Sequence, residues 1–226
     1  MKTCWNLQKM ITKLFISRPP QDIPLLAKFC KDQQIELEAK SLIRFEPLEF
    51  EQAENYDVVF FSSIRSAIFS ISSLDKSKPV ACIGKATAEK VRALGFEVTF
   101  VGDKSGDPES FGAEFKQWLG DRKVFLPVSN LSAGTIERIL DPDQVIKRTV
   151  YQTVPTTDKI EKKDLYVFSS PSNFVAFSEI NKLPACAKTI AWGKTTAKAM
   201  SEKGLAPDFT LETGDESEVI QLLTEK

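Results

Sequence analysis

Short apolar runs alternate with amphipathic stretches along the chain. The runs are apolar throughout, which is typical of parallel strands covered on both faces. The predicted strands are Leu14–Ile16, Val58–Phe61, Val80–Ile83, Val98–Val101, Val124–Leu126, Leu165–Phe168 and Thr189–Trp192. Amphipathic stretches follow these runs, and this alternation predicts parallel sheets with right-handed crossovers. The predicted fold class is therefore α/β with two doubly wound (Rossmann- or flavodoxin-like) parallel-sheet domains.

Glycine and proline mark the ends of several predicted helices. Thr87–Leu94 and Thr196–Lys203 are each followed by glycine, the usual residue just beyond a helix C-terminus. Asp107 before Pro108 predicts an N-cap followed by proline at the first helical position.

The sequence contains one internal repeat. Four short matches occur in the same order, at offsets between 107 and 110 residues. The matched pairs are Lys13–Ile16 with Lys123–Leu126, Pro47 with Pro155, Phe61–Ser63 with Phe168–Ser170, and Gly84–Ala88 with Gly193–Ala197. A fixed order at nearly one offset indicates duplication of a unit of about 110 residues.

Two longer extended stretches occupy matching places in the two repeats. Ile35–Pro47 and Gln144–Pro155 are rich in β-forming residues and end at proline. We interpret them as paired linkers rather than core strands, which makes one domain discontinuous. The predicted domains are residues 1–36 with 153–226 and residues 48–143, joined by a two-stranded linker at 37–47 and 144–152, with a cleft between them.

Composition excludes several classes of function. The 226 residues include 30 basic and 31 acidic side chains, so the basic excess typical of nucleic-acid or anionic-membrane binding is absent. The chain has no histidine, which excludes histidine triads, histidine general bases and histidine metal sites. Its four cysteines form no CxxC pair, and there is no signal-peptide core or long apolar span, so we expect a cytoplasmic protein without a metal.

The loops that follow the predicted strands share one chemistry. They carry small hydroxylated residues, glycine and an occasional cation, and they lead into helix N-termini, where free N–H groups favour anions. Each hydroxyl is also explained as an ordinary helix cap, and Lys85 and Lys194 as solvated lysines. The glycine required for a P-loop is absent, because Pro79 and Lys188 stand at that position. The candidate ligand-binding residues in these loops are Arg18, Ser62, Ser63, Arg65, Thr87, Ser129, Asn130, Ser169, Ser170, Gly193, Lys194, Thr195 and Thr196.

Tyr151 is the remaining candidate. It lies in the second extended stretch, between Val150 and Gln152. A tyrosine there is explained by packing alone, but a phenol that faces a ligand can donate a proton or a hydrogen bond.

The ordered set of these motifs resembles the uroporphyrinogen-III synthase family over essentially the whole chain from about Lys13. The motifs that carry the resemblance are Ser17-Arg18-Pro19, Phe61-Ser62-Ser63-Ile64, Leu126-Pro127-Val128-Ser129-Asn130, Val150-Tyr151-Gln152-Thr153, Phe168-Ser169-Ser170-Pro171 and Gly193-Lys194-Thr195-Thr196-Ala197. The sequence departs from the family pattern at Lys85 and Lys194, which follow the loop glycines, and at Ile64.

The resemblance implies two α/β domains joined by a two-stranded ladder, with the active site in the cleft. It implies a lyase that cyclises hydroxymethylbilane, an anionic linear tetrapyrrole, with inversion of ring D and loss of water, and that uses no cofactor. Tyr151 would assist departure of the hydroxyl, while the loop residues would bind side-chain carboxylates. The resemblance also implies a monomer, with transient contact to the preceding bilane-forming deaminase.

Three other functions are compatible with parts of the pattern. A non-catalytic two-domain anion-binding protein would bind ligand without forming product. A sugar-nucleotide transferase is usually longer and commonly uses a histidine or an acidic base. A duplicated signalling scaffold would show exposed apolar patches and no cleft.

Overall fold

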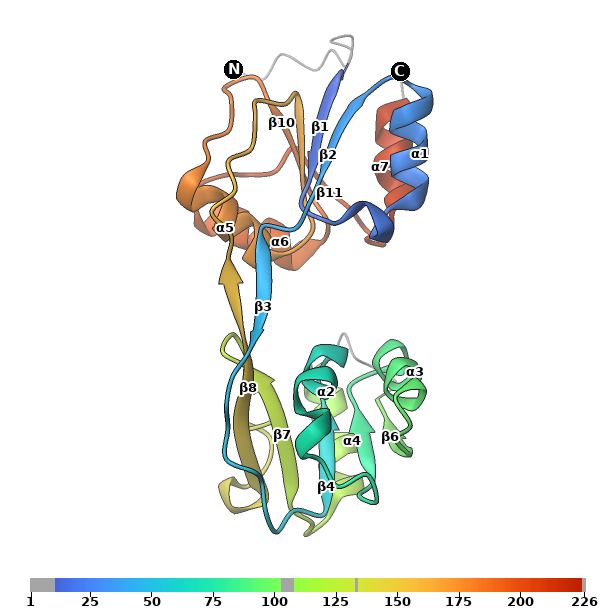
Figure 1. The fold of residues 1–226 in the computed structure, drawn as a ribbon, viewed down its shortest axis with the longest axis vertical. Coiled ribbons are helices and arrows are strands. Elements are labelled where there is room, and N and C mark those ends of the chain that lie inside the picture. Colours follow the sequence, from blue (N-terminus) through green and yellow to red (C-terminus); the bar gives the residue numbers. More distant parts are fainter. Residues whose placement is uncertain (1–10, 103–107, 133, 225–226) are drawn as a thin grey trace. The chain divides into compact units, whose positions relative to one another are not determined.

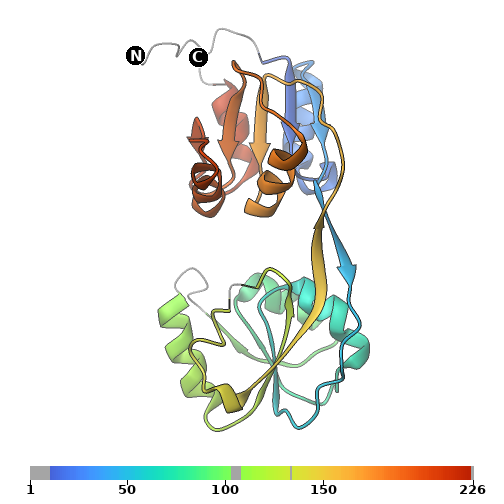
Figure 2. The same cartoon turned by 90° about the vertical axis from the view of Figure 1, so that its left-hand side faces the viewer.

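The computed structural model describes residues 11–102, 108–132 and 134–224. The chain divides into two compact units (Figures 1 and 2): unit 1 is Met1–Arg44 with Pro155–Lys226, and unit 2 is Phe45–Val154. Unit 1 is thus discontinuous in sequence. Among the described residues, no helix has both the length and the apolar character needed to cross a membrane.

Unit 1 is built on a parallel sheet with the strand order β11-β10-β9-β1-β2. The strands are β1 (Lys13–Ile16), β2 (Glu36–Ala39), β9 (Leu165–Phe168), β10 (Lys188–Ala191) and β11 (Phe209–Thr210). The helices are η1 (Pro20–Asp22), α1 (Pro24–Asp32), α5 (Pro171–Ile180), α6 (Lys194–Glu202) and α7 (Glu216–Thr224).

Alternate residues of β1 in unit 1 pack against helices on opposite faces of the sheet. Leu14 and Ile16 belong to a core cluster with Leu26 of α1 and Val219 of α7. Phe15 points to the other face, in the cluster that contains residues of α5 and α6. Unit 1 is therefore doubly wound, as the uniformly apolar strands predict.

Unit 2 repeats this arrangement around a second sheet, with the order β3-β8-β7-β4-β5-β6. Its strands are β3 (Ile43–Pro47), β4 (Val58–Phe61), β5 (Val80–Cys82), β6 (Val98–Val101), β7 (Val124–Ser129) and β8 (Val145–Pro155). Its helices are α2 (Ile64–Ser70), η2 (Ile71–Ser73), α3 (Lys85–Ala93), α4 (Pro108–Leu119) and η3 (Pro142–Gln144). Residues of α2 and α3 pack with Val59 and Phe61, while residues of α4 pack with Val58 and Phe60 on the opposite face.

Every predicted strand is confirmed, and the two glycine-terminated helices are confirmed with starts two residues earlier, at Lys85 and Lys194. The predicted N-cap Asp107 lies outside the described residues.

The two extended stretches, interpreted as linkers rather than core strands, also contribute strands to the sheets over part of each. Residues 36–39 form β2, which pairs with β1 from Lys13↔Glu36 to Ile16↔Ala39. Residues 145–151 pair with β7 as part of β8. Both segments extend their sheets by satisfying the free edges of β1 and β7. The units change at Arg44/Phe45 and Val154/Pro155.

The two sheets have the same strand order once the repeat is taken into account. The order β11-β10-β9-β1-β2 of unit 1 corresponds to β6-β5-β4-β7-β8 of unit 2. The first repeat supplies β1 and β2 to unit 1 and β4 to β6 to unit 2, whereas the second supplies β7 and β8 to unit 2 and β9 to β11 to unit 1. Each unit therefore contains strands from both repeats.

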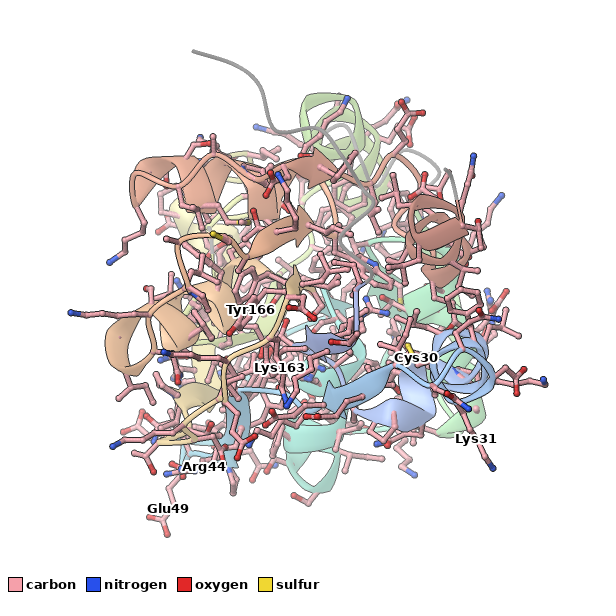
Figure 3. All side chains as sticks on the ribbon, turned by 90° about the horizontal axis from the view of Figure 1, so that it is seen from above. Cys30, Lys31, Arg44, Glu49, Lys163 and Tyr166 are labelled. Carbon is pink, nitrogen blue, oxygen red and sulfur yellow. The ribbon has the colours of Figure 1, made fainter. Side chains whose placement is uncertain are left out.

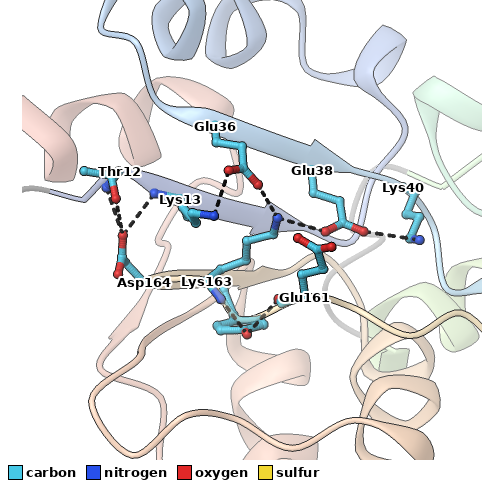
Figure 4. A network of polar contacts seen from close by, with 9 residues as sticks. Thr12, Lys13, Glu36, Glu38, Lys40, Glu161, Lys163 and Asp164 are labelled. Carbon is cyan, nitrogen blue, oxygen red and sulfur yellow. Dashed lines mark hydrogen bonds and ion pairs between the residues drawn. The ribbon is translucent and has the colours of Figure 1, made fainter.

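A polar network ties the segment before β9 to β1 and β2 (Figure 4). The Nζ of Lys163 lies 2.7 Å from Glu36 Oε1 and 3.1 Å from Glu38 Oε2. Its backbone N–H donates to the hydroxyl of Tyr166 at 3.0 Å, and the two residues lie together in unit 1 (Figure 3). The next residue, Asp164, accepts hydrogen bonds from two backbone N–H groups at the start of β1. This network fixes the order of strands at one edge of the sheet.

Candidate functional site

Unit 2 contains a cavity of about 350 Å³ at the carboxyl ends of β4, β5 and β7. Ligands of open parallel sheets bind at this edge, because helix N-termini gather there. The lining combines apolar side chains with several hydroxyl groups. The apolar lining residues are Phe60, Ile83, Phe111, Leu126, Val128, Leu131 and Ile136, and the others are Ser62, Ser63, Ser129, Ser132, Gly134, Thr135, Glu137 and Tyr151.

Ser62 and Ser63 bring the start of α2 to the cavity. Ser63 has an extended backbone, and its hydroxyl accepts a hydrogen bond from Ser66 N at 3.3 Å, so it is the N-cap of the helix. Ser62 is exposed beside it. A capped helix start keeps unpaired N–H groups that can donate to an anion.

Ser129 and Asn130 follow β7 and have different roles. The hydroxyl of Ser129 lines the cavity and accepts a hydrogen bond from Leu131 N at 3.2 Å. Asn130 does not line the cavity. Its N–H donates to the carbonyl of Tyr151, and its Oδ1 accepts from Thr153 N at 2.9 Å. Asn130 therefore holds the end of β7 against β8 beside Tyr151.

Tyr151 reaches the cavity from β8. Its side chain is 7% exposed and stacks on Phe69, with ring centroids 5.1 Å apart and planes 20° apart. Phe45 lies edge-on to the same ring at 6.0 Å. Among the described residues the phenol has no hydrogen-bond partner. A packed ring with an uncommitted hydroxyl can donate to a ligand in the cavity.

Two other candidates of unit 2 lie outside the cavity lining. Arg65, the second residue of α2, is exposed, and its guanidinium lies 4.0 Å from the centre of the Phe45 ring. Thr87, the third residue of α3, is half-buried. Of the candidates in this unit, the structure brings Ser62, Ser63, Ser129 and Tyr151 together in the cavity lining, which does not include Arg65, Thr87 or Asn130.

One acidic side chain also lines the cavity. Glu137 is 22% exposed and forms an ion pair with Lys147 of β8 at 2.8 Å. This pairing neutralises much of the carboxylate charge that would otherwise repel an anionic ligand.

In unit 1, hydroxyls tie the carboxyl ends of β1 and β9 together. Ser169 Oγ donates to the carbonyl of Ser17 at 2.7 Å, and Ser17 Oγ accepts from Ser169 N at 2.8 Å. Ser170 is the N-cap of α5, and its hydroxyl accepts from both the backbone and the side-chain nitrogen of Asn173. These two candidate serines are therefore already engaged in holding strand and helix ends.

The start of α6 presents N–H groups rather than a cluster of hydroxyls. Gly193 occupies the N-cap position, followed by exposed Lys194 and Thr195. Thr196 is only 2% exposed, so its side chain packs inside unit 1. Burial limits access of a ligand to the Thr196 hydroxyl, whereas its backbone N–H lies at a helix position without an intrahelical partner.

Arg18, at the end of β1, rests on an aromatic ring. Its guanidinium lies 4.2 Å from the ring centre of Trp192, which is 8% exposed. The contact restrains the guanidinium against the ring, and in the described part of the chain its N–H groups have no hydrogen-bond acceptor.

The described part of the chain also contains two buried cysteines and possible metal ligands. Burial raises the pKa of the Cys30 thiol to about 11 and that of Cys82 to about 12, so neither forms thiolate at neutral pH. Within the same ranges, no cluster of three or more cysteine and carboxylate side chains is arranged to hold a metal ion.

Comparison with known proteins decides the family. The family model described as uroporphyrinogen-III synthase HemD matches residues 26–213, most of the chain. The chain belongs to the uroporphyrinogen-III synthase family. It is accordingly an enzyme of tetrapyrrole biosynthesis, a cyclising lyase that converts hydroxymethylbilane into uroporphyrinogen III. No curated protein matches the chain in sequence.

Solved structures of the family share its fold. The uroporphyrinogen-III synthetase of Helicobacter pylori 26695 superposes with a TM-score of 0.72 at 16% identity, covering 94% of this chain and 98% of that chain. A mutant uroporphyrinogen III synthase of the extremely thermophilic bacterium Thermus thermophilus gives 0.62 at 15% identity, covering 94% and 98%. At these identities the likeness establishes the fold, while the roles of residues rest on the geometry of this chain.

Sequence reasoning missed several aromatic residues that contact the candidate side chains in the two units of this uroporphyrinogen-III synthase. Phe45 and Phe69 surround Tyr151, and Trp192 supports Arg18. Nothing in the sequence separates these aromatic residues from core residues. Thr135 lines the cavity from the segment after β7, and its hydroxyl group is the only sequence feature that could have suggested a binding role.

Proposed function

We propose that the cavity of unit 2 holds the reacting end of hydroxymethylbilane and that Tyr151 assists departure of the hydroxyl group. The observation that carries the proposal is the uncommitted phenol of Tyr151 in a cavity whose lining combines apolar side chains with hydroxyl groups and a helix start. A pyrrole ring suits the apolar lining residues, while the acetate and propionate groups suit the hydrogen-bond donors in the same lining.

The proposed reaction uses two proton transfers, one from the phenol of Tyr151 to the substrate and a later one from the substrate back to the phenolate. As the terminal C–O bond breaks, its electron pair leaves on oxygen, the phenol of Tyr151 gives a proton, and the hydroxyl departs as water. The pyrrole nitrogen stabilises the remaining cation, which the other end of the chain attacks. After inversion of ring D and closure, the proton lost when the ring regains aromaticity returns to the phenolate. No net acid or base is consumed.

Control of substrate conformation is the second part of the proposal. The bilane closes on its own to the wrong isomer, so the protein needs positioning more than strong acid–base groups. We propose that hydroxyls, helix N–H groups and arginines bind the substrate carboxylates. The proposed binding residues are Arg18, Ser62, Ser63, Arg65, Thr87, Ser129, Asn130, Ser169, Ser170, Gly193, Lys194, Thr195 and Thr196. Asn130 would act by holding β8 in position, and the buried Thr196 would act through its backbone N–H.

The test supplies freshly generated hydroxymethylbilane and separates type I from type III product. The protein should form type III, while type I alone would refute the proposed function. Saturable binding without product would instead support a non-catalytic anion-binding protein.

The role of Tyr151 is tested by Tyr151→Phe. Phenylalanine keeps the stacking on Phe69, so stability should change little. We expect kcat to fall about 100-fold, equivalent to about 2.7 kcal/mol in the activation barrier, with KM nearly unchanged. The matched control is Tyr56→Phe, a buried tyrosine of the same unit whose hydroxyl accepts from Asp75 N and does not line the cavity. Equal kcat values for the two variants would remove Tyr151 from the mechanism.

We further propose that the enzyme acts as a cytoplasmic monomer that contacts the preceding bilane-forming deaminase transiently. The free thiols of Cys30, Cys82 and Cys186 are consistent with a reducing compartment. Sedimentation of the protein with and without the deaminase tests both the monomer and the contact.

A further inference from the structure

Four side chains of unit 2 form a connected aromatic and cationic cluster beside the cavity. Phe69 of α2 stacks on Tyr151 at 5.1 Å, and Phe45 of β3 meets Tyr151 edge-on at 6.0 Å with the planes at 69°. The guanidinium of Arg65 lies 4.0 Å from the centre of the Phe45 ring. Only Tyr151 of the four lines the cavity.

We infer that Phe45 and Phe69 are positioning residues of the reaction: Phe69 fixes the ring of Tyr151, and Phe45 fixes both that ring and the guanidinium of Arg65. The inference rests on the proposed role of Tyr151. Neither phenylalanine touches the reacting atoms, and both act through the residue that they contact.

The geometry accounts for the role of Phe69. A tyrosine without a hydrogen bond at its hydroxyl is oriented by ring packing alone. Phe69 covers one face of the Tyr151 ring with an interplanar angle of only 20°, and Phe45 meets the ring at 69°. Offset stacking and edge contacts are the preferred aromatic geometries, and together they fix a ring in one orientation. Loss of either contact lets the phenol move relative to the leaving group.

Phe45 differs from Phe69 because it has two functional neighbours. Arg65 is exposed and occupies the first turn of α2, two residues after the capping Ser63, which lines the cavity. A long side chain in this setting samples many rotamers unless a neighbour restrains it. The Phe45 ring restrains the guanidinium by a cation–π contact and leaves its N–H donors available for a carboxylate. Phe45 therefore links substrate binding to the orientation of Tyr151.

The test compares kcat and KM in the full-length protein. Phe69→Leu should lower kcat about tenfold and leave KM near the wild-type value, because it affects Tyr151 alone. Phe45→Leu should lower kcat similarly and also raise KM about threefold, because Arg65 loses its support. Phe45→Trp retains an aromatic face and should restore KM. The matched control, Phe96→Leu, removes a buried ring of the same unit that packs on Phe61, and it should lower stability without changing kcat of the folded protein.

A double-mutant cycle separates positioning from general loss of structure. In a Tyr151→Phe background the phenol is already absent, so Phe69→Leu should cause at most a twofold further loss of kcat. An undiminished tenfold loss in that background would overturn the inference, as would wild-type kcat in both single variants. If Phe69→Leu does not fold, Phe69→Met takes its place, because the flexible methionine side chain adapts to an irregular space. A fully active Tyr151→Phe variant would reject the proposed catalytic role itself, which is a distinct outcome.

Discussion

Replacing Lys163 with methionine should loosen the edge of the unit 1 sheet while leaving unit 2 unchanged. The Lys163 side chain is 3% exposed, and its ammonium nitrogen lies 3.1 Å from Glu38, whose side chain is 24% exposed, and 2.7 Å from the half-exposed Glu36. Methionine fills the space of the aliphatic stem, so the substitution removes the ionic hydrogen bonds without a large cavity (Figure 4).

The expected loss of stability comes mainly from the hydrogen bond between Lys163 and Glu38, which is better shielded from water than the one to Glu36. A hydrogen bond to a charged group contributes about 1.5–3 kcal/mol, whereas an exposed pair contributes much less. The carboxylates of Glu36 and Glu38 keep other partners, Lys13 at 3.0 Å and Lys40 at 3.2 Å, so neither is left buried and unpaired. We expect Lys163→Met to cost about 2 kcal/mol.

Peptide-resolved hydrogen exchange at pH 7 measures this loss locally. A cost of about 2 kcal/mol corresponds to roughly 30-fold faster exchange of the β2 amides, if they exchange by opening of this edge. Peptides of unit 2 provide the internal reference. The control Lys28→Met removes an exposed pair with Asp32 on α1 and should leave β2 exchange unchanged. Unchanged β2 exchange in Lys163→Met would refute the reasoning.

The difference in stability of this sheet edge between wild type and Lys163→Met should also depend on pH. Hydrogen bonds from Lys163 and then Lys13 hold the pKa of Glu36 below its ordinary value, so this stabilisation is present above the unfolded pKa and is lost as pH falls through the folded one. Burial alone would lower the pKa of Lys163, but its bonds to Glu36 and Glu38 outweigh burial and raise it. Its stabilisation is therefore complete below the unfolded pKa and is lost as pH rises through the higher folded value. The two proteins should differ most between about pH 5 and pH 10 and converge at both extremes.

Two further predictions concern packing and thiol chemistry. Gly102→Ala should lower unfolding free energy by about 3 kcal/mol, because the new Cβ would lie 2.6 Å from a backbone carbonyl oxygen. Gly120→Ala, at a φ of +60° with open space around it, should cost only about 1 kcal/mol, and equal denaturation midpoints would contradict this ranking. In thiol titration with a disulfide reagent, Cys186→Ser should remove one fast-reacting thiol, since Cys186 is exposed. Cys30 and Cys82, with their raised pKa values, should react only on unfolding, and fast reaction of either in the native protein would refute the prediction.

The central strands and the loops after them were predictable because both follow from local rules. A strand covered on both faces must be apolar along its length, and a helix start must be capped. Ser63 and Ser170, from the two copies of the repeat, illustrate this: both have extended backbones and both accept a hydrogen bond from the N–H three residues later.

The rest of the site depends on long-range contacts that leave no local pattern. Phe45 lies 106 positions before Tyr151 in the chain, and a phenylalanine that packs on a proposed catalytic side chain has the same apolar signature as one that fills a core. The strand role of residues 36–39 was missed for a related reason. An edge strand is only half-buried, so β2 lacks the continuous apolar run that identifies the central strands.

The division of both repeats between the units has a consequence for the nascent chain. Lys13 of β1 contacts Asp164, which lies 151 residues later in the chain. At a translation rate of about 5–20 residues per second, the neighbouring strand β9 is synthesised about 8–30 s after β1. The uninterrupted segment of unit 2 emerges during that interval. Once β3 and β8 have paired there, Thr156 N can donate to the carbonyl of Leu42, which joins the two distant parts of unit 1. If unit 2 folds first, the long flexible connection between the two parts of unit 1 becomes a short one, which lowers the entropy cost of folding unit 1.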